Sequence, residues 1–158
     1  LTCNSMMSGY YQSPELDKEV FFTDNIGRKW LKTGYIGYMD ADGYVYFVDR
    51  LKRMVKISGV NVFPQEIEDC VNKFDGVLRS CIVSYKDGGK TFLKLYVVLD
   101  DGIVGDESYL DALRAHIAEN LLKYNMPKII ETVKSLPLTQ IGKVDFKILQ
   151  DRENEKSL

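Results

Sequence analysis

Residues 49–68, DRLKRMVKISGVNVFPQEIE, decide how this chain is organised. The segment opens with a charged step, 49–53, that separates two apolar stretches. Residues 54–63 then form two short apolar runs on either side of Ser58-Gly59, which predicts a β-hairpin. Pro64 suits the first turn of a helix, and the acidic residues after it suit the positive end of the helix dipole. We therefore expect a domain boundary near residue 50 and a hairpin followed directly by a helix.

Downstream of this segment the pattern predicts a small α+β domain. Apolar residues at 67, 70, 71 and 74 form one face of the helix that begins at Pro64, and Gly76 is expected to end it. The order is two strands, helix, two strands, helix, strand, helix, typical of a sheet with helices packed on it. The remaining predicted elements are strands at 78–85, 91–99 and 129–133, helices at about 108–123 and 145–152, and a loop at 136–143.

Upstream, residues 1–50 are rich in turns and aromatic side chains. Two apolar runs flank Asp42-Gly43, a dipeptide that favours a tight hairpin turn. No amphipathic helix is evident here. We expect a β-rich part that is the edge of something larger, and because the chain begins at Leu1 without a Met we expect a piece of a longer protein.

Composition excludes several classes of function. The 21 Lys and Arg against 23 Asp and Glu give a net charge of -2, without the basic excess of a nucleic-acid-binding protein. No apolar run approaches the roughly 18 residues of a membrane span, and the N-terminus lacks the pattern of a signal peptide. Three cysteines without a CxxC pair argue against a disulfide framework or a zinc site. We expect a reduced, cytoplasmic protein.

Few residues suggest chemistry by pattern alone. The single histidine, His116, falls in a helical pattern, and we interpret it as structural. Lys143 follows Gly142 in an exposed loop, but a phosphate-binding Walker A loop would need glycine where Pro137 stands. No metal-ligand spacing stands out. A basic cluster around the hairpin is either a solvated strand face or an anion site, and it comprises Arg50, Lys52, Arg53 and Lys56.

Longer motifs carry the interpretation further. They are 9–15 (GYYQSPE), 30–34 (WLKTG), 38–44 (YMDADGY), 48–68 (VDRLKRMVKISGVNVFPQEIE) and 136–145 (LPLTQIGKVD). In this order and spacing they resemble the adenylate-forming superfamily, which contains acyl-CoA synthetases, firefly luciferase and the adenylation domains of peptide synthetases. The resemblance covers nearly the whole chain.

This resemblance implies a two-step ligase that uses ATP and coenzyme A as substrates. A carboxylate attacks ATP to give an acyl-adenylate, and the acyl group then passes to the thiol of coenzyme A. Residues 51–158 resemble the mobile C-terminal lid of these enzymes, and residues 1–50 the last strands of their large N-terminal body. The phosphate loop, the acyl pocket and the Mg²⁺-binding acid would lie in that body, so we expect this chain to be inactive alone.

The resemblance also implies roles for particular residues. Lys143 would be the catalytic lysine of the first step, stabilising charge on the carboxylate and α-phosphate oxygens. Arg50 would contact the nucleotide. The family motif Thr-Gly-Asp holds the ribose with its Asp, but this chain has Tyr35 there, and a phenol cannot replace a bidentate carboxylate.

The remaining implied roles concern the second step. Lys52 falls at the hinge position, where backbone torsions absorb the rotation of the lid. Lys56 would assist thioester formation. The segment Ser58-Gly59-Val60 would line the tunnel for the pantetheine arm of coenzyme A, with Gly59 allowing close backbone approach.

Three interpretations therefore stand. The first is the C-terminal portion of an acyl-CoA synthetase that acts on a fatty or aryl acid. The second is a piece of a peptide-synthetase adenylation domain. The third is a stand-alone lid-like module that binds a partner or complements a separate body. Without that body, an exposed aromatic patch containing Trp30, Tyr38, Tyr44 and Tyr46 would favour self-association.

Overall fold

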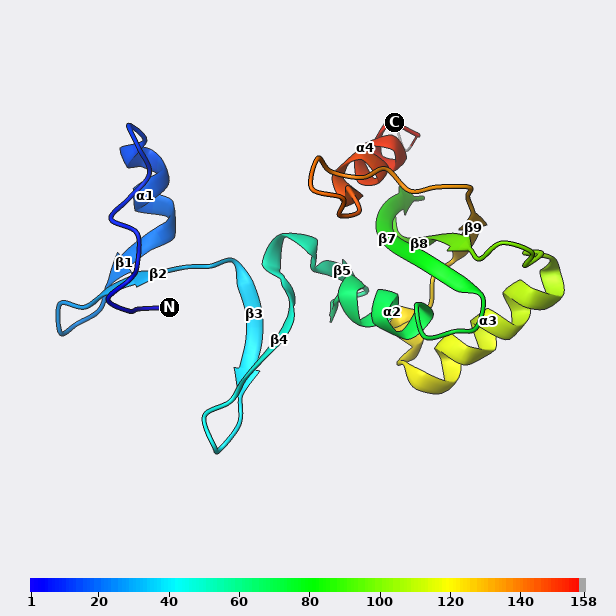
Figure 1. Cartoon of the computed structure of the whole chain (residues 1–158), viewed down its shortest axis with the longest axis horizontal. Coiled ribbons are helices and arrows are strands. Elements are labelled where there is room, and N and C mark those ends of the chain that lie inside the picture. Colours follow the sequence, from blue (N-terminus) through cyan, green and yellow to red (C-terminus); the bar gives the residue numbers. More distant parts are fainter. Residues whose placement is uncertain (157–158) are drawn as a thin grey trace. The chain divides into compact units, whose positions relative to one another are not determined.

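The computed structural model describes residues 1–156, and the chain divides into two compact units. The first comprises Leu1–Lys52, and the second begins at Arg53. Both combine helices with small sheets, so the predicted α+β class is confirmed (Figure 1). Among the described residues, none of the helices is both long enough and apolar enough to cross a bilayer.

The first unit consists of one short helix and two hairpins. Its elements are α1 (Pro14–Val20), β1 (Phe21–Thr23), β2 (Lys29–Leu31), β3 (Tyr35–Met39) and β4 (Val45–Arg50). Strand β1 pairs with β2 and β3 with β4, both antiparallel, which confirms the hairpin predicted around Asp42-Gly43. Helix α1 was not expected. It is only seven residues long and begins at Pro14, too short to display an amphipathic period.

The second unit follows the predicted order of elements. The short 3₁₀ helix η1 (Leu51–Arg53) spans the boundary between the two units. The second unit then contains β5 (Val55–Ile57), β6 (Val60–Val62), α2 (Pro64–Val71), β7 (Val77–Asp87), β8 (Lys90–Leu99), α3 (Glu107–Asn120), η2 (Lys123–Asn125), β9 (Ile129–Thr132) and α4 (Phe146–Lys156). Helix α2 ends at Val71, before the expected Gly76, and α4 runs past the expected residue 152. Gly76 instead sits in the following turn with a φ of 84°.

The main sheet has the order β7-β8-β9, with β8 in the centre. Strand β7 runs antiparallel to β8 through the Gly88-Gly89 turn, and β9 joins β8 in parallel. Both glycines of the turn have positive φ, as a two-residue hairpin with the twist of its strands requires.

Helices cover both faces of this sheet, so side chains alternate between two cores along each strand. Leu93, Leu95 and Val97 of β8 share one core with residues of α2 and α3. Tyr96 and Val98 belong to the other core, together with Leu149 of α4. Figure 1 shows α4 across the sheet from α2 and α3. The loop before α4 is thus anchored to a different face from the hairpin that opens the unit.

Two side chains cover the free edge of β7. The Glu68 carboxylate of α2 accepts the backbone N–H of Ile82 at 2.8 Å. Gln150 of α4 accepts the Ser84 N–H at 2.9 Å and donates to the Ser84 carbonyl at 2.6 Å. Residues 82 and 84 are two apart, so both present their backbone groups to the same edge. These contacts fix α2 and α4 to the strand and occupy the middle of an edge that could otherwise pair with another chain.

Candidate functional site

The Lys143 loop is a hydrogen-bonded hairpin on the surface. Leu138 forms an isolated antiparallel bridge with Val144. The Thr139 N–H donates to the Lys143 carbonyl at 2.7 Å, and the Gly142 N–H donates to the Thr139 carbonyl at 2.9 Å. Gly142 has a φ of 76°, a conformation that favours glycine before the lysine. The Lys143 side chain is exposed as predicted, but its backbone lies in a defined turn rather than an irregular loop.

The β5–β6 hairpin presents the residues assigned to the pantetheine tunnel. Lys56 lies opposite Asn61 and is exposed, whereas Ile57 and Val60 pair on the half-buried side. Ser58 and Gly59 form the turn with φ values of 50° and 87°. A Cβ added to Gly59 would meet nothing within 4 Å, so within the structure its backbone torsion, rather than a close neighbour, calls for glycine.

Tyr35 and Arg50 are brought together in the first unit, where they face each other across the β3–β4 pair. The Arg50 guanidinium lies 5.6 Å from the centre of the Tyr35 ring, and Phe47 meets the same ring edge-on at 5.4 Å. Tyr35 is 55% exposed. The aromatic ring therefore supports a cation at an accessible surface, a different arrangement from a carboxylate that accepts two hydroxyl groups.

The other aromatic residues of the first unit do not all form an exposed patch. Tyr38 and Tyr46 are exposed and stack with their ring centres 5.0 Å apart. Trp30, which was expected to be exposed, is half-buried: its indole N–H donates to Asp24 at 2.9 Å and its ring stacks on Phe22. The indole has a local partner in its own hairpin, so its aromatic character alone was a poor guide to exposure.

Arg53 does not belong to the basic surface cluster in which the sequence placed it. Its guanidinium forms a two-pronged ion pair with Glu68, at 3.0 and 2.5 Å. The side chains are 12% and 8% exposed. The guanidinium also lies 4.9 Å from the ring centre of Phe146, the first residue of α4. Lys52, the expected hinge residue, is exposed and ends the first unit.

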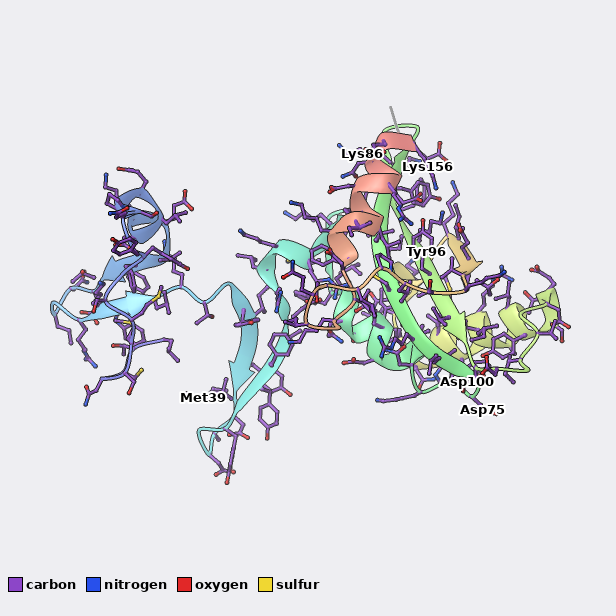
Figure 2. All side chains as sticks on the ribbon, turned by 45° about the horizontal axis from the view of Figure 1, so that its top comes forward. Met39, Asp75, Lys86, Tyr96, Asp100 and Lys156 are labelled. Atoms are coloured by element: carbon purple, nitrogen blue, oxygen red, sulfur yellow. The ribbon has the colours of Figure 1, made fainter. Side chains whose placement is uncertain are left out.

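A buried ionic network that the sequence did not suggest fastens the other end of α4. Lys94 on β8 contacts Glu153 at 3.1 Å and Glu131 of β9 at 2.7 Å. The Tyr96 hydroxyl donates to Glu153 at 2.5 Å, and Lys156 donates to the same carboxylate at 2.9 Å. Tyr96 lies on the sheet and Lys156 near the end of α4 in Figure 2. The signal in the sequence was a single lysine inside the apolar run of β8.

Electrostatics within this network favour the charged forms. Burial by itself would raise the pKa of Glu153, but hydrogen bonds from Tyr96, Lys156 and Lys94 outweigh it and lower the pKa to about 2. Burial would likewise lower the pKa of Lys94, and its hydrogen bonds to Glu131, Tyr96 and Glu153 raise it instead. The network holds α4 on the sheet as a set of paired charges.

The remaining candidate residues have structural surroundings. The Nε2 atom of His116 lies 3.1 Å from the Cys70 carbonyl oxygen, and its ring contacts Phe74, as a structural histidine would. All three cysteines are free thiols. Within residues 1–156 no group of three or more His, Cys, Asp or Glu side chains could hold a metal ion.

Known proteins are similar to this chain in both sequence and fold. Residues 66–143 match the model of the AMP-binding enzyme C-terminal domain. The long-chain-fatty-acid–CoA ligase of Salmonella typhimurium is 36% identical over 152 residues, which cover 96% of this chain and 26% of that protein. The sulfoacetate–CoA ligase of Cupriavidus necator is 37% identical over 142 residues, with coverages of 89% and 26%.

The solved structures agree. ATP-bound MatB from Rhodopseudomonas palustris superposes with a TM-score of 0.79 and 28% identity, over 96% of this chain and 29% of that one. The chain thus spans about a quarter of the length of these relatives. The two sequence relatives named above are CoA ligases. The matched domain begins within α2 and ends at Lys143. This chain belongs to the adenylate-forming, AMP-binding superfamily and carries its C-terminal domain.

Proposed function

We propose that this chain is the C-terminal portion of an acyl-CoA synthetase that activates a fatty or aryl acid with ATP and transfers it to coenzyme A. The observation that carries the proposal is the exposed Lys143 on a defined hairpin at the end of the matched domain. CoA ligases among the relatives support the reaction class. The N-terminal adenylation body would supply the acyl pocket and most of the ATP site.

In the first step, a carboxylate oxygen of the acid attacks the α-phosphorus of ATP, the bond to the β-phosphate oxygen breaks, and pyrophosphate leaves. Lys143 would place its ammonium group beside the oxygens on which negative charge concentrates, and the turn at Gly142 would aim it. Arg50 would approach the nucleotide from the β3–β4 hairpin, supported by the Tyr35 ring.

In the second step, the thiolate of coenzyme A attacks the acyl carbonyl carbon, the bond to the adenylate oxygen breaks, and AMP leaves. The turn of Ser58 and Gly59, with the neighbouring Val60, would line the passage for the pantetheine arm, and Lys56 would lie beside it on the exposed face of β5. Because the two steps would use different faces of the C-terminal domain, this domain would rotate about Lys52 between them.

The experiment joins residues 1–158 to the N-terminal three quarters of the Salmonella typhimurium relative and compares half-reactions. Lys143→Ala is expected to slow adenylate formation, followed as pyrophosphate release, by about 100-fold or more, the loss typical of a charge-stabilising group. Thioester formation from supplied acyl-adenylate and coenzyme A is expected to stay within about threefold. Lys147→Ala, an exposed lysine four residues later, is the matched control.

Two outcomes would contradict the proposal. One is a fusion with the unaltered sequence that forms no adenylate. The other is an equal loss of both half-reactions in Lys143→Ala. Residues 1–158 without the N-terminal adenylation body are expected to release no pyrophosphate from ATP. Only a stand-alone module would restore activity to an N-terminal body that is added as a separate protein. A reducing, cytoplasmic location is part of the proposal and fits the three free thiols.

A further inference from the structure

Arg53 links the start of the second unit to the base of the Lys143 hairpin. The link is a direct contact between its positive charge and an aromatic ring. It is the first residue of the unit and immediately follows the proposed hinge residue Lys52. Its guanidinium lies 4.9 Å from the centre of the Phe146 ring. Phe146 stands three residues after Lys143 and opens α4.

The contact is built rather than incidental. Both charges of the Arg53–Glu68 pair are largely removed from solvent, and the pair uses two parallel N–H···O bonds, an arrangement that fixes the plane of the guanidinium. Glu68 is itself held because one of its oxygens accepts the Ile82 N–H of β7. A cation held in this way stays beside the Phe146 ring, which is half-buried against the second core.

From Phe146 the constraint reaches Lys143 through short backbone links. The Asp145 N–H donates to the Pro137 carbonyl at 2.8 Å, which closes the base of the hairpin. Val144 bridges Leu138, and the Lys143 carbonyl accepts the Thr139 N–H. Each residue from 143 to 146 therefore has a fixed neighbour. Moving Phe146 would move the base of the turn that carries the lysine.

We propose that Arg53 is a positioning residue that couples the hinge to Lys143 through its contact with Phe146. A rotation at residues 50–52 would then carry Lys143 as one rigid body with the start of the second unit, instead of leaving the lysine on an independent loop. This inference rests on the proposed function for the roles of Lys52 and Lys143. The contacts among Arg53, Glu68 and Phe146 are its own evidence.

The first test uses the chain itself and does not depend on activity. Hydrogen exchange is measured at the amides of Thr139, Gly142 and Asp145, whose N–H groups donate to backbone carbonyls within the hairpin. Phe146→Leu keeps an apolar side chain but removes the ring, and is expected to speed exchange at these amides by at least tenfold. Phe146→Tyr keeps the ring, so its exchange rate at these amides is expected to equal that of the unaltered chain.

Arg53→Met tests the other side of the contact, and Lys94→Met is the matched control because it also removes one buried cation from a partner of α4. Arg53→Met is expected to accelerate the hairpin amides as Phe146→Leu does, and the double variant should add less than twofold. Lys94→Met should leave these amides within about twofold once exchange is corrected for global stability. Equal acceleration of the hairpin by both Arg53→Met and Lys94→Met would mean general loosening and would overturn the proposal.

The second test uses the fusion enzyme and separates this inference from the proposed function. Phe146→Leu is expected to lower kcat for adenylate formation about tenfold with an unchanged KM for ATP, and Phe146→Tyr is expected to rescue it. If Lys143→Ala abolishes adenylation but Phe146→Leu leaves kcat unchanged, the positioning role of Arg53 fails and the proposed function stands. If Lys143→Ala has no effect, the proposed function fails, and the exchange results still judge the contact.

Discussion

Glu153 offers a quantitative test of how α4 is held on the sheet. Its carboxylate is 6% exposed and accepts hydrogen bonds from Lys94, Tyr96 and Lys156. Those bonds bring its pKa from an ordinary 4.5 to about 2. Because the folded-state pKa lies below the unfolded value, the charged carboxylate stabilises the fold above pH 4.5, and this contribution is lost as pH falls toward 2.

The size of the effect follows from the two pKa values. Each pKa unit corresponds to about 1.4 kcal/mol, so Glu153 contributes on the order of 3 kcal/mol to the free energy of unfolding at pH 7. At pH 3, between the two pKa values, roughly 1 kcal/mol of this contribution remains. The chain should therefore lose about 2 kcal/mol from this one group between pH 7 and pH 3.

Glu153→Gln removes the titration and keeps an oxygen that can accept from the Tyr96 hydroxyl. We expect the variant to be about 2 to 3 kcal/mol less stable at pH 7. We also expect its stability to fall by about 2 kcal/mol less than that of the unaltered chain between pH 7 and pH 3. Urea unfolding of residues 1–158, followed by far-ultraviolet circular dichroism at several pH values, measures both quantities.

Glu155→Gln is the matched control because Glu155 lies exposed in the same helix. Its stability should follow that of the unaltered chain at every pH. Parallel pH profiles for Glu153→Gln and the unaltered chain would refute the reasoning, since they would mean that the buried carboxylate titrates in the folded state as it does in the unfolded state.

Two further predictions concern the thiols and the proposed tunnel turn. Cys3 should react with a thiol reagent at pH 8, whereas Cys81 should react only after unfolding, because burial and then the nearby Glu68 charge raise its pKa to about 12. The measurement is the number of thiols that react, with one equivalent expected in the native chain and three in urea. Gly59→Ala should lower the free energy of unfolding by about 1 kcal/mol, because a φ of 87° strains an L-residue even though a Cβ there would have open space. Thermal unfolding measures this strain, and Ser58→Gly, which is expected to be neutral or stabilising, is the comparison variant.

Local chemistry explains why much of the fold was predictable from the sequence. The turns at Asp42-Gly43, Ser58-Gly59 and Gly88-Gly89 each lie between apolar runs, and all three hairpins are present. Pro64 begins α2 as expected. These features depend on residues within a few positions of one another, so their backbone preferences act before any distant contact forms. The motifs that indicated the superfamily are equally local.

Element ends and the short helix were less predictable. Helix α2 stops at Val71, although its apolar spacing continues to Phe74, which packs beside the first core from a turn. Helix α1 has seven residues and no buried side chain. A helix this short has little intrinsic stability in water, so its presence depends on the surrounding hairpin.

The candidate site also combines features that were predictable from the sequence with features that were not. From the sequence alone came the family, the exposed Lys143 turn and the Ser58-Gly59 hairpin, since short motifs and turn chemistry specify them. Only the tertiary structure decided that Arg53 is a buried partner of Glu68 and Phe146 rather than a surface cation, and that Lys94 is enclosed by Glu131 and Glu153. The reason is physical: a charge can leave water only where opposite charges from distant segments meet it, and that meeting exists only once the chain has folded.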